Sequence, residues 1–172
     1  MREKYDVLDW VRWMRAEGCT HIYALGESLG ASVLIQTVAV DPVFRAIVAE
    51  CAYVDLQTIA EYRVREHLHL PKCVSGIAAR VVVSSGMAYA KVRYGLDLTE
   101  ASPLSAMRKS RTPTLLIHGI NDVETPVFHS KRLAEANAVA VLWLVPNANH
   151  TSASSAAPEE FQRRVLEWFA QH

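Results

Sequence analysis

The sequence predicts an α/β fold, in which a parallel sheet of about four strands is flanked by helices. Short apolar runs that suit buried parallel strands alternate along the chain with longer segments of helical periodicity. Strands that alternate with helices form β-α-β units with right-handed crossovers. The chain has 172 residues, of which 51% are hydrophobic, and this is enough for one domain with a substantial core.

The first half of the chain contains two predicted helices and two predicted strands. They are a helix at 5–16, a strand at 21–25, a helix at 29–40 and a strand at 44–49. The first helix is amphipathic and Gly18 follows it as a stop signal. The second helix consists of small and apolar residues, and Pro42 ends it.

The second half repeats the alternation after a long interval. It contains predicted strands at 114–118 and 139–145 and predicted helices at about 127–136 and 159–170. Pro113 and Pro146 bound the two strands, and Pro158 stands where proline is favoured at a helix start. Residues 52–112 separate the second strand from the third, whereas a plain crossover needs about a dozen residues.

This excess length predicts an insertion into the sheet domain. We interpret residues 1–172 as a single domain with residues 53–110 as a helical cap insertion. Within the insertion, residues 81–83 are three valines that suit either a strand or a helix. The sequence shows no internal repeat and no low-complexity segment.

Residues 26–30 form a candidate nucleophile elbow. They read GESLG, which matches the pattern G-x-S-x-G between a predicted strand and a predicted helix. In such a turn the flanking glycines let the strand and helix approach closely, and Ser28 is lifted above the sheet. The backbone N–H of Leu29 would point at a developing oxyanion. The alternative is a chance match at a glycine-rich helix start, and Glu27 is expected to play a supporting polar role.

Two further residues complete a candidate catalytic triad in the expected chain order of serine, acid and histidine. Asp122 follows the third predicted strand, and His150 follows the fourth. Both therefore lie at carboxyl ends of strands, where open parallel sheets build their sites. The alternatives are a turn or helix-capping role for Asp122 and a solvent-exposed loop position for His150, while Glu124 is a weaker candidate for the acid.

The remaining histidines and the cysteines predict no second site. His21 and His118 are expected to be structural strand residues. His67 and His69 lack a third ligand nearby in sequence, so no metal is expected. The three cysteines, Cys19, Cys51 and Cys73, are odd in number and widely spaced, which predicts free thiols and no disulfide framework.

Composition narrows the classes of partner. Eighteen basic residues balance eighteen acidic ones, which argues against a nucleic-acid-binding surface. No apolar run approaches the roughly 20 residues needed to span a bilayer, so no membrane partner is expected. The N-terminus has no signal-peptide pattern, which favours a cytoplasmic location.

The sequence resembles the α/β-hydrolase superfamily and is similar to the C-terminal half of its serine esterases. The resemblance rests on the GESLG elbow, on LLIHGIND at 115–122 with Pro126 after it, and on Asn149 beside His150. Residues 102–104 also resemble linkers between cap and core in such hydrolases. The resemblance implies Ser28 as the nucleophile, Asp122 as the acid and His150 as the base.

The chain departs from this family at its front. Family members have about eight strands, and a loop that often reads His-Gly supplies the second oxyanion donor, but no such segment precedes Ser28. We therefore expect a truncated α/β-hydrolase fold. The strand at 21–25 would then lack a partner on one side, which favours pairing with a second copy or with a separate N-terminal half.

The leading functional hypothesis is a serine hydrolase that cleaves a small-molecule carboxylic ester or thioester through an acyl-enzyme, with no cofactor. One alternative is a serine peptidase of the same fold. Another is a non-catalytic hydrolase fragment that acts as an interaction module, because loss of one oxyanion donor can cost about 10²–10³ in rate.

Overall fold

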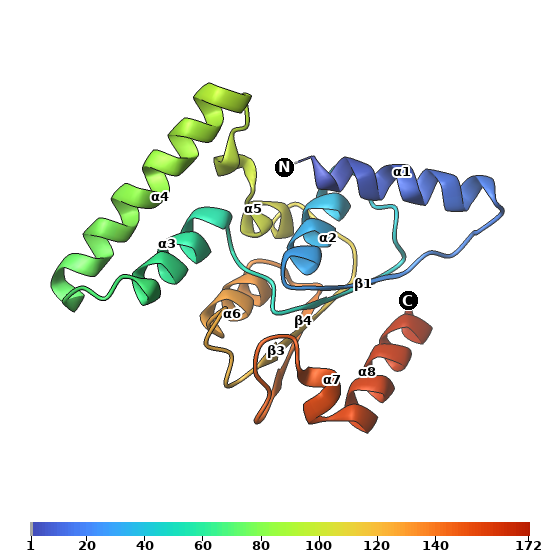
Figure 1. Cartoon of the computed structure of the whole chain (residues 1–172). Helices are drawn as coiled ribbons and strands as arrows, with labels where there is room; N and C mark the ends of the chain where they lie inside the picture. The colour runs from blue at the N-terminus through green and yellow to red at the C-terminus, as the bar shows by residue number, and fades with distance from the viewer. Residues whose placement is uncertain (1) are drawn as a thin grey trace. The chain divides into compact units, whose positions relative to one another are not determined.

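The structure is a computed structural model that describes residues 2–172, apart from the side chain of Lys72, and it contains two compact units. One unit comprises residues 2–53 and 103–172, and the other comprises residues 54–102. Figure 1 shows the course of the chain. Each unit has its own internal packing.

The first unit is built on a parallel sheet with the strand order β1-β2-β3-β4. Its strands are β1 (Ala24–Glu27), β2 (Ile47–Glu50), β3 (Thr114–Gly119) and β4 (Ala140–Val145). Its helices are α1 (Glu3–Ala16), α2 (Leu29–Val40), α5 (Pro103–Met107), α6 (Phe128–Glu135), α7 (Ala153–Ala156) and α8 (Pro158–Gln171). The predicted parallel sheet of four strands flanked by helices is confirmed.

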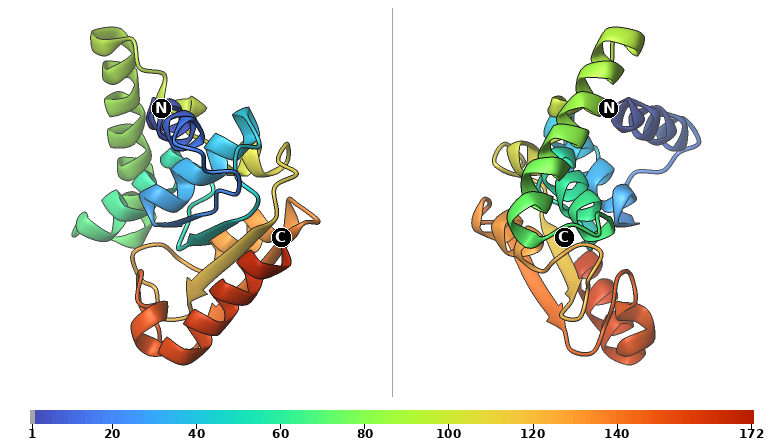
Figure 2. Two further views of the ribbon diagram at one scale, coloured as in Figure 1. Left: turned by 90° about the vertical axis from the view of Figure 1, so that its right-hand side faces the viewer. Right: turned by 60° about the vertical axis from the view of Figure 1, so that its left-hand side comes forward.

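Helices cover both faces of this sheet. Figures 1 and 2 show α2 on one face and α8 on the other. The core beneath α8 joins Val48, Leu115 and Ile117 to Val165, with the side chain of Trp168 packed against this cluster. All residues of β2 and β3 are buried, which explains why their sequences are almost continuously apolar.

The first two strands lie further along the chain than predicted. The strand expected at 21–25 begins at Ala24, and the strand expected at 44–49 begins at Ile47. Phe44 is buried without joining the ladder, and His21 is exposed before β1, so the prediction of His21 as a strand residue is wrong. Strand bounds follow from pairing with a neighbour, and hydrophobicity along one segment does not report that pairing.

Strand β1 lies at one edge of the sheet that the structure describes. Its described partner is β2, with Ala24 opposite Ile47 and Glu27 opposite Glu50. Leu25 on this strand is exposed. Pairing of this edge with a second copy or a separate N-terminal half stays a prediction.

The second unit consists of helices. They are α3 (Leu56–His67), α4 (Lys72–Tyr94) and a short 3-10 turn, η1 (Leu98–Glu100). The Asp55 carboxylate accepts the Thr58 N–H at 2.7 Å and so caps α3, while Gly95 ends α4 with a φ of 66°. The valines at 81–83 are helical, and the role of 53–110 as a cap stays a prediction.

Helix α4 departs from one expectation of the sequence analysis. Its residues Cys73–Tyr94 are long and apolar enough, by length and composition, to cross a membrane. The expectation that no apolar segment approaches the length of a membrane span is therefore wrong for this helix. Helices of soluble proteins meet the same criterion, so this finding assigns no membrane contact.

Candidate active site

Ser28 lies at the sharp turn between β1 and α2. Its backbone has φ 51° and ψ −112°, a conformation that non-glycine residues rarely adopt. A Cβ atom at Gly26 would lie 2.8 Å from the backbone carbon of Gly30, so glycine is needed there. Beyond its own helix, a Cβ at Gly30 would meet no described atom within 4 Å, and the expectation that both glycines allow close packing holds only for Gly26.

Asp122 lies in the loop after β3, and the loop backbone fixes its carboxylate. Oδ1 accepts the N–H of Glu124 at 2.9 Å and the N–H of Thr125 at 2.8 Å. Burial alone would raise the pKa of Asp122, but hydrogen bonds from His118, His150 and the loop amide outweigh burial and hold that pKa well below its ordinary value. Asp122 is therefore an ionised acceptor at neutral pH.

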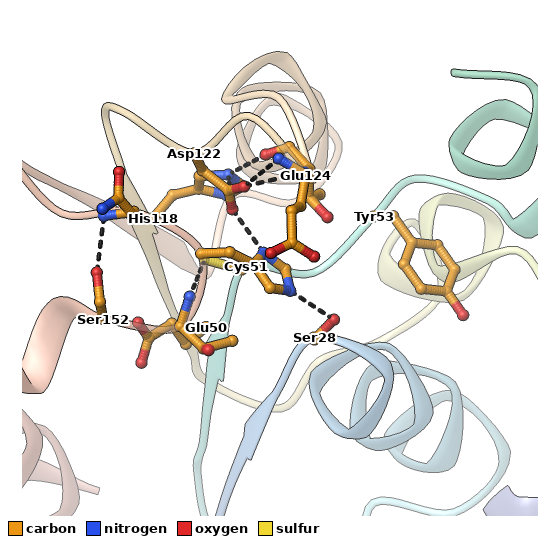
Figure 3. Close-up of polar contacts among 12 residues, drawn as sticks. Ser28, Glu50, Cys51, Tyr53, His118, Asp122, Glu124 and Ser152 are labelled. Atoms are coloured by element: carbon orange, nitrogen blue, oxygen red, sulfur yellow. Dashed lines mark hydrogen bonds and ion pairs between the residues drawn. The ribbon is translucent and has the colours of Figure 1, made fainter. Parts of the chain in front are cut away.

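His150 connects the acid to the serine. Its Nδ1 lies 2.8 Å from Asp122 Oδ2, and its Nε2 lies 2.9 Å from Ser28 Oγ. Figure 3 draws these contacts as an unbroken line of hydrogen bonds from Asp122 to Ser28. The His150 side chain is 13% exposed, so solvent reaches one part of the ring.

The structure brings together three residues that lie as many as 122 positions apart in sequence. Each follows the carboxyl end of a different strand, β1, β3 or β4. Leu29 is the first residue of α2, so its N–H lies at the positive end of that helix. The roles of these four residues in catalysis stay predictions at this point. The Glu124 N–H donates to Asp122 Oδ1, and the ranking of the Glu124 carboxyl below Asp122 as the acid stays a prediction.

The residues at the end of β2 were not recognised as site residues from the sequence. Cys51 is buried and has a φ of 52°, and its Sγ accepts the Thr151 N–H at 3.5 Å. Burial raises the pKa of the Cys51 thiol to about 12. A cysteine with positive φ directly after a buried strand is an unusual arrangement, but the residue type alone gives no sign of it.

Glu50 precedes this cysteine and is completely buried. Its Oε1 accepts the Ala153 N–H at 3.0 Å, and its Oε2 has no hydrogen-bond partner within residues 2–172. Burial raises the pKa of the Glu50 carboxyl, and the nearby Glu27 raises it further. Figure 3 shows Glu50 near Ser152, in the loop that follows β4.

We expect Glu50→Gln to be more thermally stable than the native chain at pH 8, with the difference vanishing below about pH 4. A carboxyl with a raised folded-state pKa favours folding below its unfolded pKa of about 4.3, and that contribution is lost as pH rises through the folded pKa. Glutamine cannot ionise, so it avoids this loss. Thermal unfolding measured from pH 4 to pH 8 checks the result, with the exposed Glu100→Gln as control. A pH-independent difference would contradict it.

His118 and Gly119, at the end of β3, contact the loops that carry Asp122 and His150. His118 is buried, as expected for a structural histidine, and its Nε2 lies 2.7 Å from the Thr125 carbonyl oxygen and 3.3 Å from Asp122 Oδ2. At Gly119 a Cβ would lie 2.3 Å from the Ala148 carbonyl oxygen. The backbone of β3 therefore touches the loop that leads to the histidine.

One group of side chains has the spacing of a metal site. Sγ of Cys51 and the ligand atoms of Asp122 and His150 all lie within 4.8 Å of one another. Thiolate, carboxylate and imidazole are ligands that zinc accepts. Hydrogen bonds among these groups account for their proximity without an ion, and the absence of a metal stays a prediction.

Comparisons with known proteins show the family and the fold. A model of the prolyl oligopeptidase family matches residues 79–172, which is more than half of the chain. Among curated protein sequences none matches this chain.

Solved structures are similar to most of the chain. The Pyrococcus furiosus esterase Pf2001 has a TM-score of 0.71 and 22% identity, and the match covers 99% of this chain and 62% of the esterase. The meta-cleavage product hydrolase of Pseudomonas fluorescens has a TM-score of 0.60 and 18% identity, over 92% of this chain and 68% of that one. An α/β-hydrolase enzyme from a Medee basin deep-sea metagenome has a TM-score of 0.60 and 21% identity, over 94% and 71%. These likenesses confirm the α/β-hydrolase fold.

Proposed function

This chain belongs to the prolyl oligopeptidase family of α/β-hydrolases, and on that premise we propose that it is a serine hydrolase acting through an acyl-enzyme. The observation that carries the proposal is the 2.9 Å contact between Ser28 Oγ and His150 Nε2, together with the 2.8 Å contact from Nδ1 to Asp122. This is the geometry in which an imidazole can take the serine proton while a carboxylate holds its tautomer.

In the proposed reaction, Ser28 Oγ attacks the acyl carbon and its proton passes to His150 Nε2. The new C–O bond places negative charge on the former carbonyl oxygen, which the Leu29 N–H stabilises. The intermediate then collapses, the bond to the leaving group breaks, and His150 returns the proton to the leaving oxygen or sulfur. Water attacks the acyl-enzyme by the same route and restores the free serine.

Throughout this sequence Asp122 is expected to remain ionised. Its low pKa keeps a negative charge next to Nδ1, which stabilises the imidazolium that forms when Nε2 accepts the proton. No step needs a cofactor. We propose small-molecule carboxylic esters or thioesters as the substrate class, and the likeness to the Pyrococcus furiosus esterase supports the ester part of this proposal.

A serine peptidase is a second candidate, and the family match is the observation that favours it. Hydrolysis of an ester and hydrolysis of a peptide use the same triad, and they differ mainly in the leaving group that His150 must protonate. A p-nitrophenyl ester and a p-nitroanilide peptide assayed side by side distinguish the two. A larger kcat/KM for the ester supports the first proposal, and the reverse supports the peptidase.

Ser28→Ala is expected to abolish covalent labelling by a fluorophosphonate probe, because the probe reacts with an activated serine oxygen. The measurement is the stoichiometry of labelling in intact protein by mass spectrometry. Ser85→Ala, which changes an exposed serine on α4, serves as the matched control and should label fully. Folded native protein that takes up no probe would contradict the proposal and favour the interaction module.

A further inference from the structure

We propose that Glu50 and Cys51, the last residue of β2 and the one after it, are positioning residues that align the serine, the acid and the histidine. Together they are called the Glu50–Cys51 pair. Strand β2 lies between β1 and β3 in the sheet, so its carboxyl end reaches the segments that carry Ser28 and Asp122. The inference rests on the proposed function where it concerns rate, and on geometry alone where it concerns alignment.

The pair holds the serine through the backbone. The Ser28 N–H donates to the Glu50 carbonyl oxygen at 2.8 Å, one residue beyond the last register pair of β1 and β2, Glu27 with Glu50. This bond fixes the amide of a residue whose φ and ψ are strained. A strained turn persists only where its surroundings determine it, so the bond to β2 helps to hold the serine in its elbow.

The pair also holds the loop of the histidine at two points. Thr151 donates its N–H to Cys51 Sγ at 3.5 Å, and Ala153 donates its N–H to Glu50 Oε1 at 3.0 Å. These two residues lie one and three positions after His150. Thr151 has a φ of 49°, so the loop turns sharply directly after the imidazole. Both anchors are buried side chains, and they limit how far the loop can shift.

The third connection runs from the cysteine to the acid. The Cys51 N–H donates to the Ile117 carbonyl oxygen at 2.9 Å, which fixes its backbone against β3. Its thiol hydrogen-bonds with the Asp122 carboxylate, and Sγ lies within 4.8 Å of that carboxylate and of a ring nitrogen of His150. Because burial raises the pKa of the thiol to about 12, Cys51 keeps its proton at neutral pH and remains a donor.

The side-chain contacts give each residue of the pair a conservative variant that keeps its side-chain hydrogen bonds and an alanine variant that removes them, while the backbone bonds to Ser28 and Ile117 remain in every variant. Glu50→Gln keeps an oxygen for the Ala153 N–H, and Cys51→Ser keeps a hydroxyl that can donate to Asp122. Glu50→Ala and Cys51→Ala remove these groups. A residue needed only for stability would affect folding, whereas a positioning residue would also affect the orientation of His150 and kcat.

The first measurement needs no activity. The ¹⁵N chemical shifts of the His150 ring, assigned by comparison with His150→Ala, report which ring nitrogen carries the proton. We expect the native chain, Glu50→Gln and Cys51→Ser to hold the proton on Nδ1, as a bond to Asp122 requires. We expect the two alanine variants to show a mixture of tautomers. Alanine variants that fold and keep the native shifts would overturn the proposal.

The second measurement is steady-state hydrolysis of p-nitrophenyl acetate. We expect kcat to fall about 10- to 100-fold in each alanine variant, because a small misplacement of a catalytic group can cost about 10²-fold. KM should stay within about twofold, and the conservative variants should stay within about threefold of the native kcat. Equal losses of kcat in Glu50→Ala and Glu50→Gln, with the fold intact, would overturn the role assigned to the hydrogen bond from the Ala153 N–H to Glu50 Oε1.

The two measurements separate this inference from the proposed function. If the native chain shows no hydrolysis and no labelling, but the alanine variants still show mixed His150 tautomers, the result contradicts the proposed hydrolase and supports the positioning role of the Glu50–Cys51 pair. An active native chain whose alanine variants match it in tautomer and kcat supports the enzyme and overturns the pair. If Cys51→Ala fails to fold, the comparison of Glu50→Ala with Glu50→Gln decides the question.

Discussion

His150→Ala is expected to lower kcat for ester hydrolysis by about 10⁴–10⁶-fold, the scale seen when a triad member is removed from a serine hydrolase. His150 Nε2 lies 2.9 Å from Ser28 Oγ, and removing the imidazole takes away the group placed to accept the serine proton. The hydroxyl then remains a weak nucleophile. Rates of p-nitrophenyl acetate hydrolysis, corrected for background, measure the effect.

The fold should survive this substitution, because His150 is a loop residue and its side chain is partly exposed. His69→Ala is the matched control, since it removes an exposed imidazole from the helical unit. It should leave kcat unchanged within about twofold. A His150→Ala protein that keeps more than about a tenth of the native kcat would rule out His150 as the general base.

Gly119→Ala is expected to displace the loop of the histidine and to lower both stability and kcat. The added Cβ would lie 2.3 Å from the Ala148 carbonyl oxygen and 2.5 Å from the Asn149 carbonyl oxygen, and backbone atoms cannot rotate away as a side chain can. Overpacking of this kind typically costs about 1–3 kcal/mol. A displaced His150 should also reduce kcat about 10²-fold. Urea unfolding and steady-state hydrolysis measure the two effects.

Gly86→Ala supplies the control for this prediction. Gly86 lies within α4, and a Cβ there would meet no described atom within 4 Å beyond its own helix. Alanine should therefore stabilise that helix by about 0.5–1 kcal/mol and leave kcat unchanged. A Gly119→Ala protein with native stability and native kcat would contradict the prediction, because it would show that β3 and the loop before His150 can move apart without loss of free energy.

The sequence predicted the strands and helices best where a single segment determines its own structure. Helix α2 at Leu29–Val40 has the predicted bounds, and β3 and β4 lie within one residue of theirs. Apolar runs bounded by proline carry this information directly. Strand β1 begins three residues later than predicted because its start depends on pairing with β2. The valines at 81–83 stayed ambiguous because three consecutive β-branched residues have no periodicity.

The residues of the candidate site that could be predicted are those that chain order and position after a strand identify. Ser28, Asp122 and His150 each follow a predicted strand, and the structure places them in contact. Glu50 and Cys51 also follow a predicted strand, but their contacts depend on β2 lying between β1 and β3. Strand order in the sheet is a tertiary property, and the buried glutamate and the positive φ of the cysteine follow from it.

The two ends of the helical unit at 54–102 lie close together. The Leu56 N–H donates to the Ala101 carbonyl oxygen at 3.0 Å, so the chain leaves the sheet and returns to it through neighbouring points. A segment whose ends meet can be shortened, enlarged or exchanged for another with little strain on what surrounds it. All three side chains of the proposed triad lie outside it. Mutation can therefore remodel this segment during evolution without replacing any side chain of the proposed triad.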